Sequence, residues 1–139
     1  MADVAACINA SNASFRLLNI VAADVLVAAS FTSDAVYTDN FLNFVATGTT
    51  ELEAALTSVS RASAHMNGNV RYHTGSHTVL EYGSNYIVHM HVDVLEDLGR
   101  IASMDVCDKL KLEGGNWRVY ERLCSPLACT PTTATPFTG

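Results

Sequence analysis

Asp108 is the acidic residue whose setting in the sequence most strongly suggests chemistry. It lies in an extended run, residues 101–112, in which nearly every second side chain is apolar. Alternate residues of a strand share a face, so Asp108 is expected in a row with Ala102, Met104, Val106, Leu110 and Leu112. A carboxyl group in such a row has to be hydrogen-bonded, protonated or in contact with water. The pattern predicts a general acid or base or, alternatively, a structural acid bonded to a helix terminus or to Arg122.

A second acidic stretch spans residues 31–40 and carries Asp34, Tyr37 and Asp39. Asp34 stands where a chain that leaves a helix favours a side chain bonded to its own backbone. Asp39 follows a short extended run, so it is expected at the end of a strand with its carboxylate directed into the fold. There it could abstract a proton, and Tyr37 on the same face could donate a hydrogen bond to an oxyanion. The alternatives are a solvated turn acid and an aromatic core residue whose hydroxyl lies at the rim.

A third group of candidate residues lies on a predicted strand, residues 86–95. His89, His91 and Asp93 share one face of it, and His-x-His is a spacing found in metal sites. The opposite face is the better core face and carries Tyr86, Val88, Met90, Val92 and Val94. The histidines are therefore expected to face outward or toward a subunit contact, and we predict no metal site and no cofactor.

The composition describes one globular domain. With 139 residues, 49% of them hydrophobic and 16% charged, the chain is long enough to bury a core and too apolar to be disordered. The surplus of apolar side chains suggests a lined cavity or a buried dimer face. We predict a single domain over residues 1–129 and a tail over residues 130–139, which is rich in Thr and Pro.

Charge and hydropathy argue against several classes of partner. The net charge is −6 and the eight Lys and Arg residues are scattered, which argues against binding to nucleic acid. No apolar run is long enough to span a membrane and the N-terminus lacks the basic segment of a signal peptide, so no membrane partner and a cytoplasmic location are predicted. The four cysteines lack metal-ligand spacing and are interpreted as free thiols, with a bridge between Cys124 and Cys129 left open.

Hydrophobic periodicity predicts helices in the first half of the chain. A weak helix is expected over residues 3–13, and an apolar stripe over residues 14–31 indicates further helix, in which Asp24 caps a short second segment. The sequence Thr50-x-x-Glu53 has the form of a capping box and is expected to begin a helix over residues 51–66.

After the predicted helix over residues 51–66, the spacing of apolar residues changes from a period of 3.6 to a period of 2. This alternation predicts antiparallel strands over residues 70–82, 86–95, 101–112 and 117–124. On the last strand Arg118 and Arg122 are expected on the solvent face, either solvated or paired with Glu113 and Glu121. Helices followed by strands predict an α+β domain with the helices on one face of a curved sheet. The outer face of the sheet is judged apolar enough for a homodimer.

Three segments of the chain also carry the motifs of a known superfamily. Residues 31–40 are similar to the pattern F-x-x-D-A-x-x-x-D, and residues 72–85 are similar to H-x-x-(G/S)-x-x-V-x-x-x-G-D-x-A, with Tyr86 in place of the final small residue. Residues 108–122 are very close to D-x-L-x-R-x-x-G-x-W-R-I-x-x-R. The chain thus resembles, over residues 14–124, the SnoaL-like and ketosteroid isomerase-like branch of the nuclear transport factor 2-like superfamily. That resemblance implies a cone-shaped barrel of the cystatin-like type, with helices packed in a strongly curved mixed or antiparallel sheet.

The resemblance implies an enzyme of polyketide- or terpenoid-type secondary metabolism that isomerises, cyclises or dehydrates a hydrophobic carbonyl compound without a cofactor. Asp39 and Asp108 would divide the base and acid roles, His73 would polarise or relay, and Tyr37 would hold the oxyanion. The residues implied in substrate binding are His65, Tyr86, Val88, Met90, Met104, Val106 and Trp117.

A non-catalytic carrier of a hydrophobic ligand and a dimerisation module are the alternatives to an enzyme. Convergence of Asp39, Asp108 and His73 on one cavity would favour catalysis, whereas their separation, or a salt bridge to an arginine, would favour the carrier. His65, at a helix end, is alternatively a partner of the helix dipole, and Trp117 is alternatively a core residue.

Overall fold

The computed structural model of the chain describes residues 2–16, 18, 21–40, 43–64, 71–96 and 99–126. The predicted tail and the predicted pocket residue His65 lie outside the described residues. None of the helices in the described ranges is long and apolar enough to cross a membrane.

The described residues form three helices and six strands. The helices are α1 (Ala2–Arg16), α2 (Ala23–Ser30) and α3 (Gly48–Ala64). The strands are β1 (Phe31–Asp39), β2 (Phe44–Thr47), β3 (Arg71–Tyr82), β4 (Asn85–Glu96), β5 (Gly99–Glu113) and β6 (Asn116–Ser125). The last four strands begin and end within two residues of their predicted bounds, because period-two alternation and glycine turns mark both ends.

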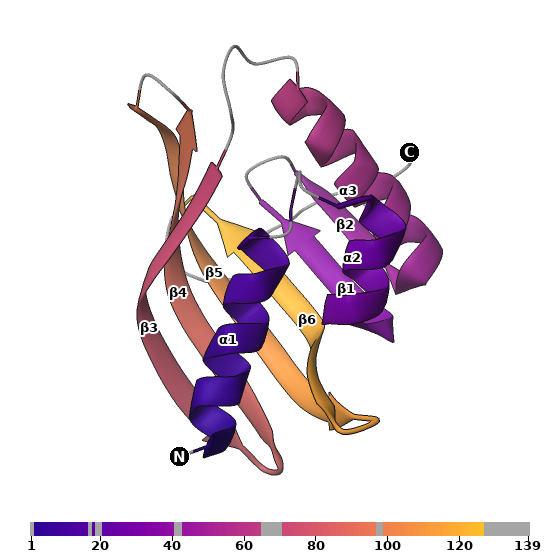
Figure 1. Cartoon of the computed structure of the whole chain (residues 1–139), viewed down its shortest axis with the longest axis vertical. Coiled ribbons are helices and arrows are strands. Elements are labelled where there is room, and N and C mark those ends of the chain that lie inside the picture. The colour runs from indigo at the N-terminus through magenta and orange to yellow at the C-terminus, as the bar shows by residue number, and fades with distance from the viewer. Residues whose placement is uncertain are drawn as a thin grey trace.

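All six strands belong to one sheet in the order β2-β1-β6-β5-β4-β3. Strands β3 to β6 form the predicted antiparallel meander, whereas β1 lies parallel to β6 and antiparallel to β2. Figure 1 shows α1 lying across the concave side of the curved sheet, with α2 and α3 beside β1 and β2. The predicted α+β architecture, with helices on one face of a strongly curved mixed sheet, is confirmed.

The core lies between the helices and the concave face of the sheet. Its largest fully buried side chains include Phe15, Leu26, Leu52, Leu56, Met90, Leu110, Val88, Val92, Val106 and Val119. These positions confirm the predicted inner faces of β4 and β5, with one exception. Leu112 is 57% exposed, because it lies at the end of β5 beside the turn at Gly114 and Gly115.

Both predicted helix caps are wrong. Helix α3 begins at Gly48 rather than at residue 51. Glu51 lies in its first turn, where Oε1 accepts a hydrogen bond from the backbone N–H of Thr47 at 3.1 Å. The N-cap of α2 is Ala22, whose side chain cannot accept a hydrogen bond. Asp24 lies instead in the exposed first turn of α2, where its charge still interacts favourably with the helix dipole.

The interpretation of all four cysteines as free thiols is also wrong. Cys107, on the outward face of β5, is disulfide-bonded, whereas Cys7 and Cys124 are free and buried. The bridge left open between Cys124 and Cys129 does not form, because Cys124 faces the core, where its Sγ donates to the Tyr37 hydroxyl at 3.7 Å. Burial, helped by the charge of Asp3, raises the pKa of Cys7 to about 11. A thiol with so high a pKa is a poor nucleophile.

Gly48 provides a test of the start of α3. Its φ of +82° lies in the left-handed region, and the nearest atom to an added Cβ is the Ser33 carbonyl oxygen at 3.8 Å. Gly48→Ala should therefore lower the free energy of unfolding by about 1–2 kcal/mol through backbone strain without a steric clash. Gly75→Ala is the control, because Gly75 has no positive φ and no atom within 4 Å of an added Cβ. Urea unfolding measures both, and equal stabilities would contradict the assigned conformation of Gly48.

Candidate functional site

The candidate site depends on a β-bulge in β6. Lys109 on β5 pairs with Glu121 and Leu110 pairs with Val119, which leaves Tyr120 as an extra residue in β6. A one-residue insertion shifts every later side chain of a strand to the other face. The bulge therefore turns Arg122 inward, opposite Asp108, and corrects the prediction that Arg122 lies on the solvent face.

Asp108 and Arg122 form a buried, bidentate ion pair. Nε of Arg122 donates to Oδ1 of Asp108 at 2.7 Å, and Nη2 donates to Oδ2 at 2.6 Å. Asp108 is 0% exposed and Arg122 is 2% exposed. Burial by itself would lower the pKa of Arg122, but the charge of Asp108 and its hydrogen bonds raise that pKa above its ordinary value. Arg122 is therefore charged, and its contact with Asp108 agrees with the alternative interpretation of Asp108 as a structural acid bonded to Arg122.

Helix α1 supplies a further hydrogen-bond partner for the guanidinium. Nη2 of Arg122 also donates to Oγ of Ser14 at 2.5 Å, and Ser14 in turn donates to the carbonyl oxygen of Ser11 at 2.6 Å. This chain of hydrogen bonds connects α1 to the centre of the sheet, and it gives the buried Ser14 hydroxyl both an acceptor and a donor.

Three aromatic rings surround the guanidinium of Arg122. Its Cζ lies 4.2 Å from the ring centroid of Phe15, 5.2 Å from that of Phe31 and 5.6 Å from that of Tyr37. Aromatic faces attract a cation, more strongly where water is excluded. The rings come from α1 and from both ends of β1, so Arg122 is held by three separate segments of the chain.

Tyr37, Asp39 and Cys124 lie beside this ion pair. Tyr37 is 3% exposed, and burial above all raises its pKa well above 10.0, so its hydroxyl stays protonated. Asp39 ends β1 as predicted and is 5% exposed. Asp39 lies opposite Cys124 in the pairing of β1 with β6, and its charge contributes to the raised pKa values of both Tyr37 and Cys124. We call these six residues the interior cluster: Ser14, Tyr37, Asp39, Asp108, Arg122 and Cys124.

The fold brings together three of the four predicted catalytic residues. Tyr37, Asp39 and Asp108 belong to the interior cluster, whereas His73 is exposed on β3. Its neighbour Tyr72 packs against Phe15 in the core, with ring centroids 5.9 Å apart, so His73 points to the outer face. The other two neutral members of the cluster, Ser14 and Cys124, were not predicted from the sequence as site residues.

The predicted substrate-binding residues that the structure describes lie on the helix-facing side of the sheet. Val88, Met90 and Val106 are fully buried, and Met104 is 8% exposed. Tyr86 and Trp117 are half-buried and contact each other edge to face, with ring centroids 5.3 Å apart. Their role in substrate binding stays a prediction.

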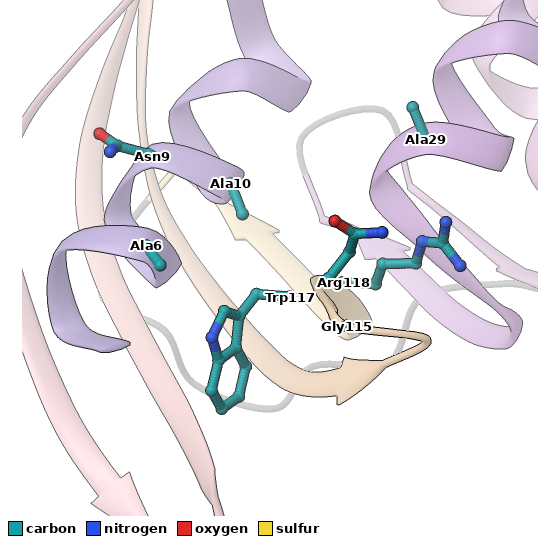
Figure 2. Close-up of a pocket in the computed structure, with 8 residues that line it drawn as sticks. Ala6, Asn9, Ala10, Ala29, Gly115, Trp117 and Arg118 are labelled. Atoms are coloured by element: carbon teal, nitrogen blue, oxygen red, sulfur yellow. The ribbon is translucent and has the colours of Figure 1, made fainter. Parts of the chain in front are cut away.

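A groove of about 610 Å³ lies between α1, α2 and the β5–β6 turn (Figure 2). It is lined by Ala6, Asn9, Ala10, Ala29, Gly115, Asn116, Trp117 and Arg118. Its volume falls within the range typical of small-molecule sites. Arg118 pairs with Glu113 as predicted, with Nη1 donating to Oε1 at 3.0 Å, whereas Glu121 pairs with Lys109 rather than with an arginine.

The outer face of β4 and β5 is polar. Nδ1 of His91 lies 3.3 Å from Oδ1 of Asp105, and its Nε2 lies 3.0 Å from Oδ1 of Asp93, which also accepts a hydrogen bond from Ser103. This polar network lies on the face that was predicted to be apolar enough for a homodimer. Dimerisation itself stays a prediction. Among the described residues no group of three or more His, Cys, Asp or Glu is placed to hold a metal ion.

His91 should make stability depend on pH. Hydrogen bonds to Asp105 first and Asp93 second raise its pKa above 6.5. A group whose pKa is raised by folding stabilises the fold fully below its unfolded pKa, and this contribution is lost as the pH rises through the folded pKa. His91→Asn should therefore reduce stability mainly below about pH 6.5, by less than about 1 kcal/mol because the side chain is half-exposed.

Thermal unfolding of the wild type and His91→Asn across a pH series measures this effect. Asp105→Asn should also flatten the pH dependence, because it removes the first hydrogen-bond partner of His91. A difference between wild type and His91→Asn that grows as the pH rises would contradict the assigned sign.

Comparison with known proteins identifies the fold. No family model matches the chain, and no curated protein matches it. Among solved structures, a protein of unknown function with a cystatin-like fold from Nostoc punctiforme is 17% identical, with a TM-score of 0.74 over 88% of this chain and 89% of that one. An NTF2-like protein with a cystatin-like fold from Novosphingobium aromaticivorans is also 17% identical, with a TM-score of 0.73 over 88% of this chain and 80% of that one.

A third similar structure is that of a complex. It is a protein from Catenulispora acidiphila in complex with S-DNPA, 16% identical, with a TM-score of 0.72 over 88% of this chain and 92% of that one. At such identities the likeness establishes the fold and leaves the activity open. The sheet of the described residues is open, with β2 and β3 at its edges, so the cone-shaped barrel implied by the sequence resemblance is not closed. The rest of the implied fold is confirmed: the chain has the cystatin-like fold of the NTF2-like proteins.

Proposed function

We propose that this protein binds a hydrophobic small molecule without transforming it, as a carrier. The observation that carries the proposal is the bidentate contact between Asp108 and Arg122, in which both carboxylate oxygens accept hydrogen bonds from one guanidinium. Asp108 was the strongest candidate for an acid–base group, and a salt bridge to an arginine is the arrangement expected of a carrier.

The chemistry of the pair supports this choice over proton transfer by Asp108. A general acid or base has to exchange a proton with the substrate from within hydrogen-bond reach. Asp108 is 0% exposed, and both of its carboxylate oxygens already accept hydrogen bonds from Arg122, so neither oxygen is within reach of a substrate. His73, the proposed relay, lies on the other face of the sheet, so it cannot assist Asp108.

Two further observations support ligand binding. The groove beside α1 and α2 has about 610 Å³, enough for a small organic molecule. A protein of the same fold from Catenulispora acidiphila forms a complex with S-DNPA. The ligand class proposed is a hydrophobic compound of polyketide or terpenoid type, in keeping with the sequence resemblance.

A second candidate function is acid–base catalysis by Asp39. It is favoured by the neighbourhood of Tyr37, whose burial keeps the phenol protonated. Tyr37 could donate a hydrogen bond to a substrate carbonyl oxygen while Asp39 takes a proton from the adjacent carbon. Isomerisation, cyclisation and dehydration all begin with that step.

Native mass spectrometry and thermal-shift screening against polycyclic ketones and phenols, followed by product analysis, separate the two functions. Binding without turnover is the result expected of a carrier. Turnover that Asp39→Asn abolishes, and that Asp34→Asn leaves intact, would establish the enzyme instead. Asp34 is the matched control because it is an exposed acid on the same strand. Failure to bind any compound of the panel would contradict both candidates.

A further inference from the structure

We propose that the groove between α1, α2 and the β5–β6 turn is the ligand site, and that it takes a flat aromatic molecule with one hydrogen-bond acceptor oxygen. This inference rests on the proposed function, because it assigns a place and a chemical class to the ligand. The groove is separate from the interior cluster, since none of its lining residues belongs to that cluster.

The walls of the groove suit a flat molecule. Ala6 and Ala10 on α1 and Ala29 on α2 present single methyl groups, which let a planar ring approach both helices closely. Figure 2 shows these alanines on two helices that flank the start of β6, with Trp117 and Arg118 between them. Two helices that expose small side chains toward a shared space leave room for an aromatic ring.

Trp117 supplies an aromatic surface at one side of the groove. Its indole is fixed by the edge-to-face contact with Tyr86, whose ring centroid lies 5.3 Å away. A half-buried indole held in one orientation is a favourable partner for stacking or edge contacts with a second ring. Figure 2 shows the indole directed to the α1 side of the groove, while Arg118 extends toward α2.

Arg118 determines the polar part of the ligand. Its Nη1 donates to Glu113, but its buried Nε has no hydrogen-bond partner among the described residues. A buried donor without a partner is unfavourable, and an acceptor oxygen in the groove would relieve it after a small side-chain rotation. Because Glu113 already balances the charge of Arg118, a carbonyl or phenol oxygen suits the site better than a phosphate.

The chain contains one tryptophan, so the indole N–H gives a single NMR signal that reports on this groove. The probe is 9-fluorenone, a flat tricyclic ketone, and the matched compound is fluorene, which has the same rings without the oxygen. Titration of ¹⁵N-labelled wild-type protein with 9-fluorenone should shift the Trp117 indole signal to saturation. Fluorene and the Arg118→Met variant with 9-fluorenone should each bind about tenfold more weakly, as expected for one lost hydrogen bond.

Two neighbouring alanines of α2 provide a steric test. Ala29→Leu fills the groove and should weaken binding of 9-fluorenone by about tenfold or more, whereas Ala28→Leu should leave it unchanged. Ala28 is exposed and is not among the lining residues, so the pair differs only in which side of the helix is enlarged. Equal binding by the two variants would overturn the assigned site.

Together with the native mass spectrometry screen, the NMR titration distinguishes failure of the assigned groove from failure of the proposed carrier function. Compounds that bind in native mass spectrometry without moving the indole signal would overturn the groove as the site and leave the carrier standing. Fluorene binding as tightly as 9-fluorenone would overturn the requirement for an acceptor oxygen. Turnover of a groove-bound compound would keep the site and overturn the carrier.

Discussion

Replacement of Arg122 by methionine should lower the free energy of unfolding by about 3–5 kcal/mol, because it leaves a buried carboxylate without its counter-charge. Asp108 is fully buried, and Arg122 is its bidentate partner. Methionine keeps an unbranched apolar chain among the surrounding rings but offers no donor. Urea unfolding measures the loss, and a domain of ordinary stability has only about 5–15 kcal/mol in total.

The neighbouring cross-strand pair provides a matched control. Lys109 and Glu121 occupy the next register position on the same two strands, but their side chains are 40% and 45% exposed. Lys109→Met should therefore cost less than about 1 kcal/mol. The difference between the stability losses of Arg122→Met and Lys109→Met measures the effect of burial, because strand positions and charge types are similar in the two pairs.

A double variant tests whether Asp108 and Arg122 act as one unit. Asp108→Leu combined with Arg122→Met removes both charges, so most of the stability lost in either single variant should return. A double variant as unstable as the sum of the two single variants would show that the two residues contribute independently. Recovery would also support the carrier, because it would assign the pair a role in stability.

The sequence was sufficient to predict the meander and its inner faces. Alternation along β4 and β5 placed Val88, Met90, Val106 and Asp108 toward the helices, and all four are fully buried. When one face of a sheet is buried, every second residue of a strand is apolar, and this alternation can be recognised in a single sequence. The short extended run before Asp39 likewise placed that residue at the end of a strand, inside the fold.

The centre of the candidate site could not be predicted in the same way. Alternation counted from Val119 places Glu121 inward and Arg122 outward, but the extra residue Tyr120 reverses that order. A one-residue bulge is hard to recognise in a single sequence, because it changes only which of the later side chains of the strand face inward. The parallel pairing of β1 with β6 was equally hidden, because it joins segments separated by most of the chain.

Phe15→Ala should cost about 3–5 kcal/mol of unfolding free energy, because it opens a cavity beside the guanidinium. Phe15 is 1% exposed, and its ring lies 4.2 Å from Cζ of Arg122, the shortest of the three ring contacts. Phe15→Leu keeps most of the apolar volume but loses the ring. It should cost less than the alanine variant, with a cation–π share of about 1–2 kcal/mol in a dry site.

Measuring Phe15→Leu a second time, in the Arg122→Met background, separates packing from the attraction of the cation. If the ring stabilises Arg122 through its π-face, the leucine variant should lose about 1–2 kcal/mol less in that background than in the wild type. An equal loss in both backgrounds would assign the contribution of Phe15 to packing alone. The hydrogen bonds from Arg122 to Asp108 and Ser14 would then account for the placement of the guanidinium, and α1 would be joined to the sheet through Ser14 rather than through its aromatic ring.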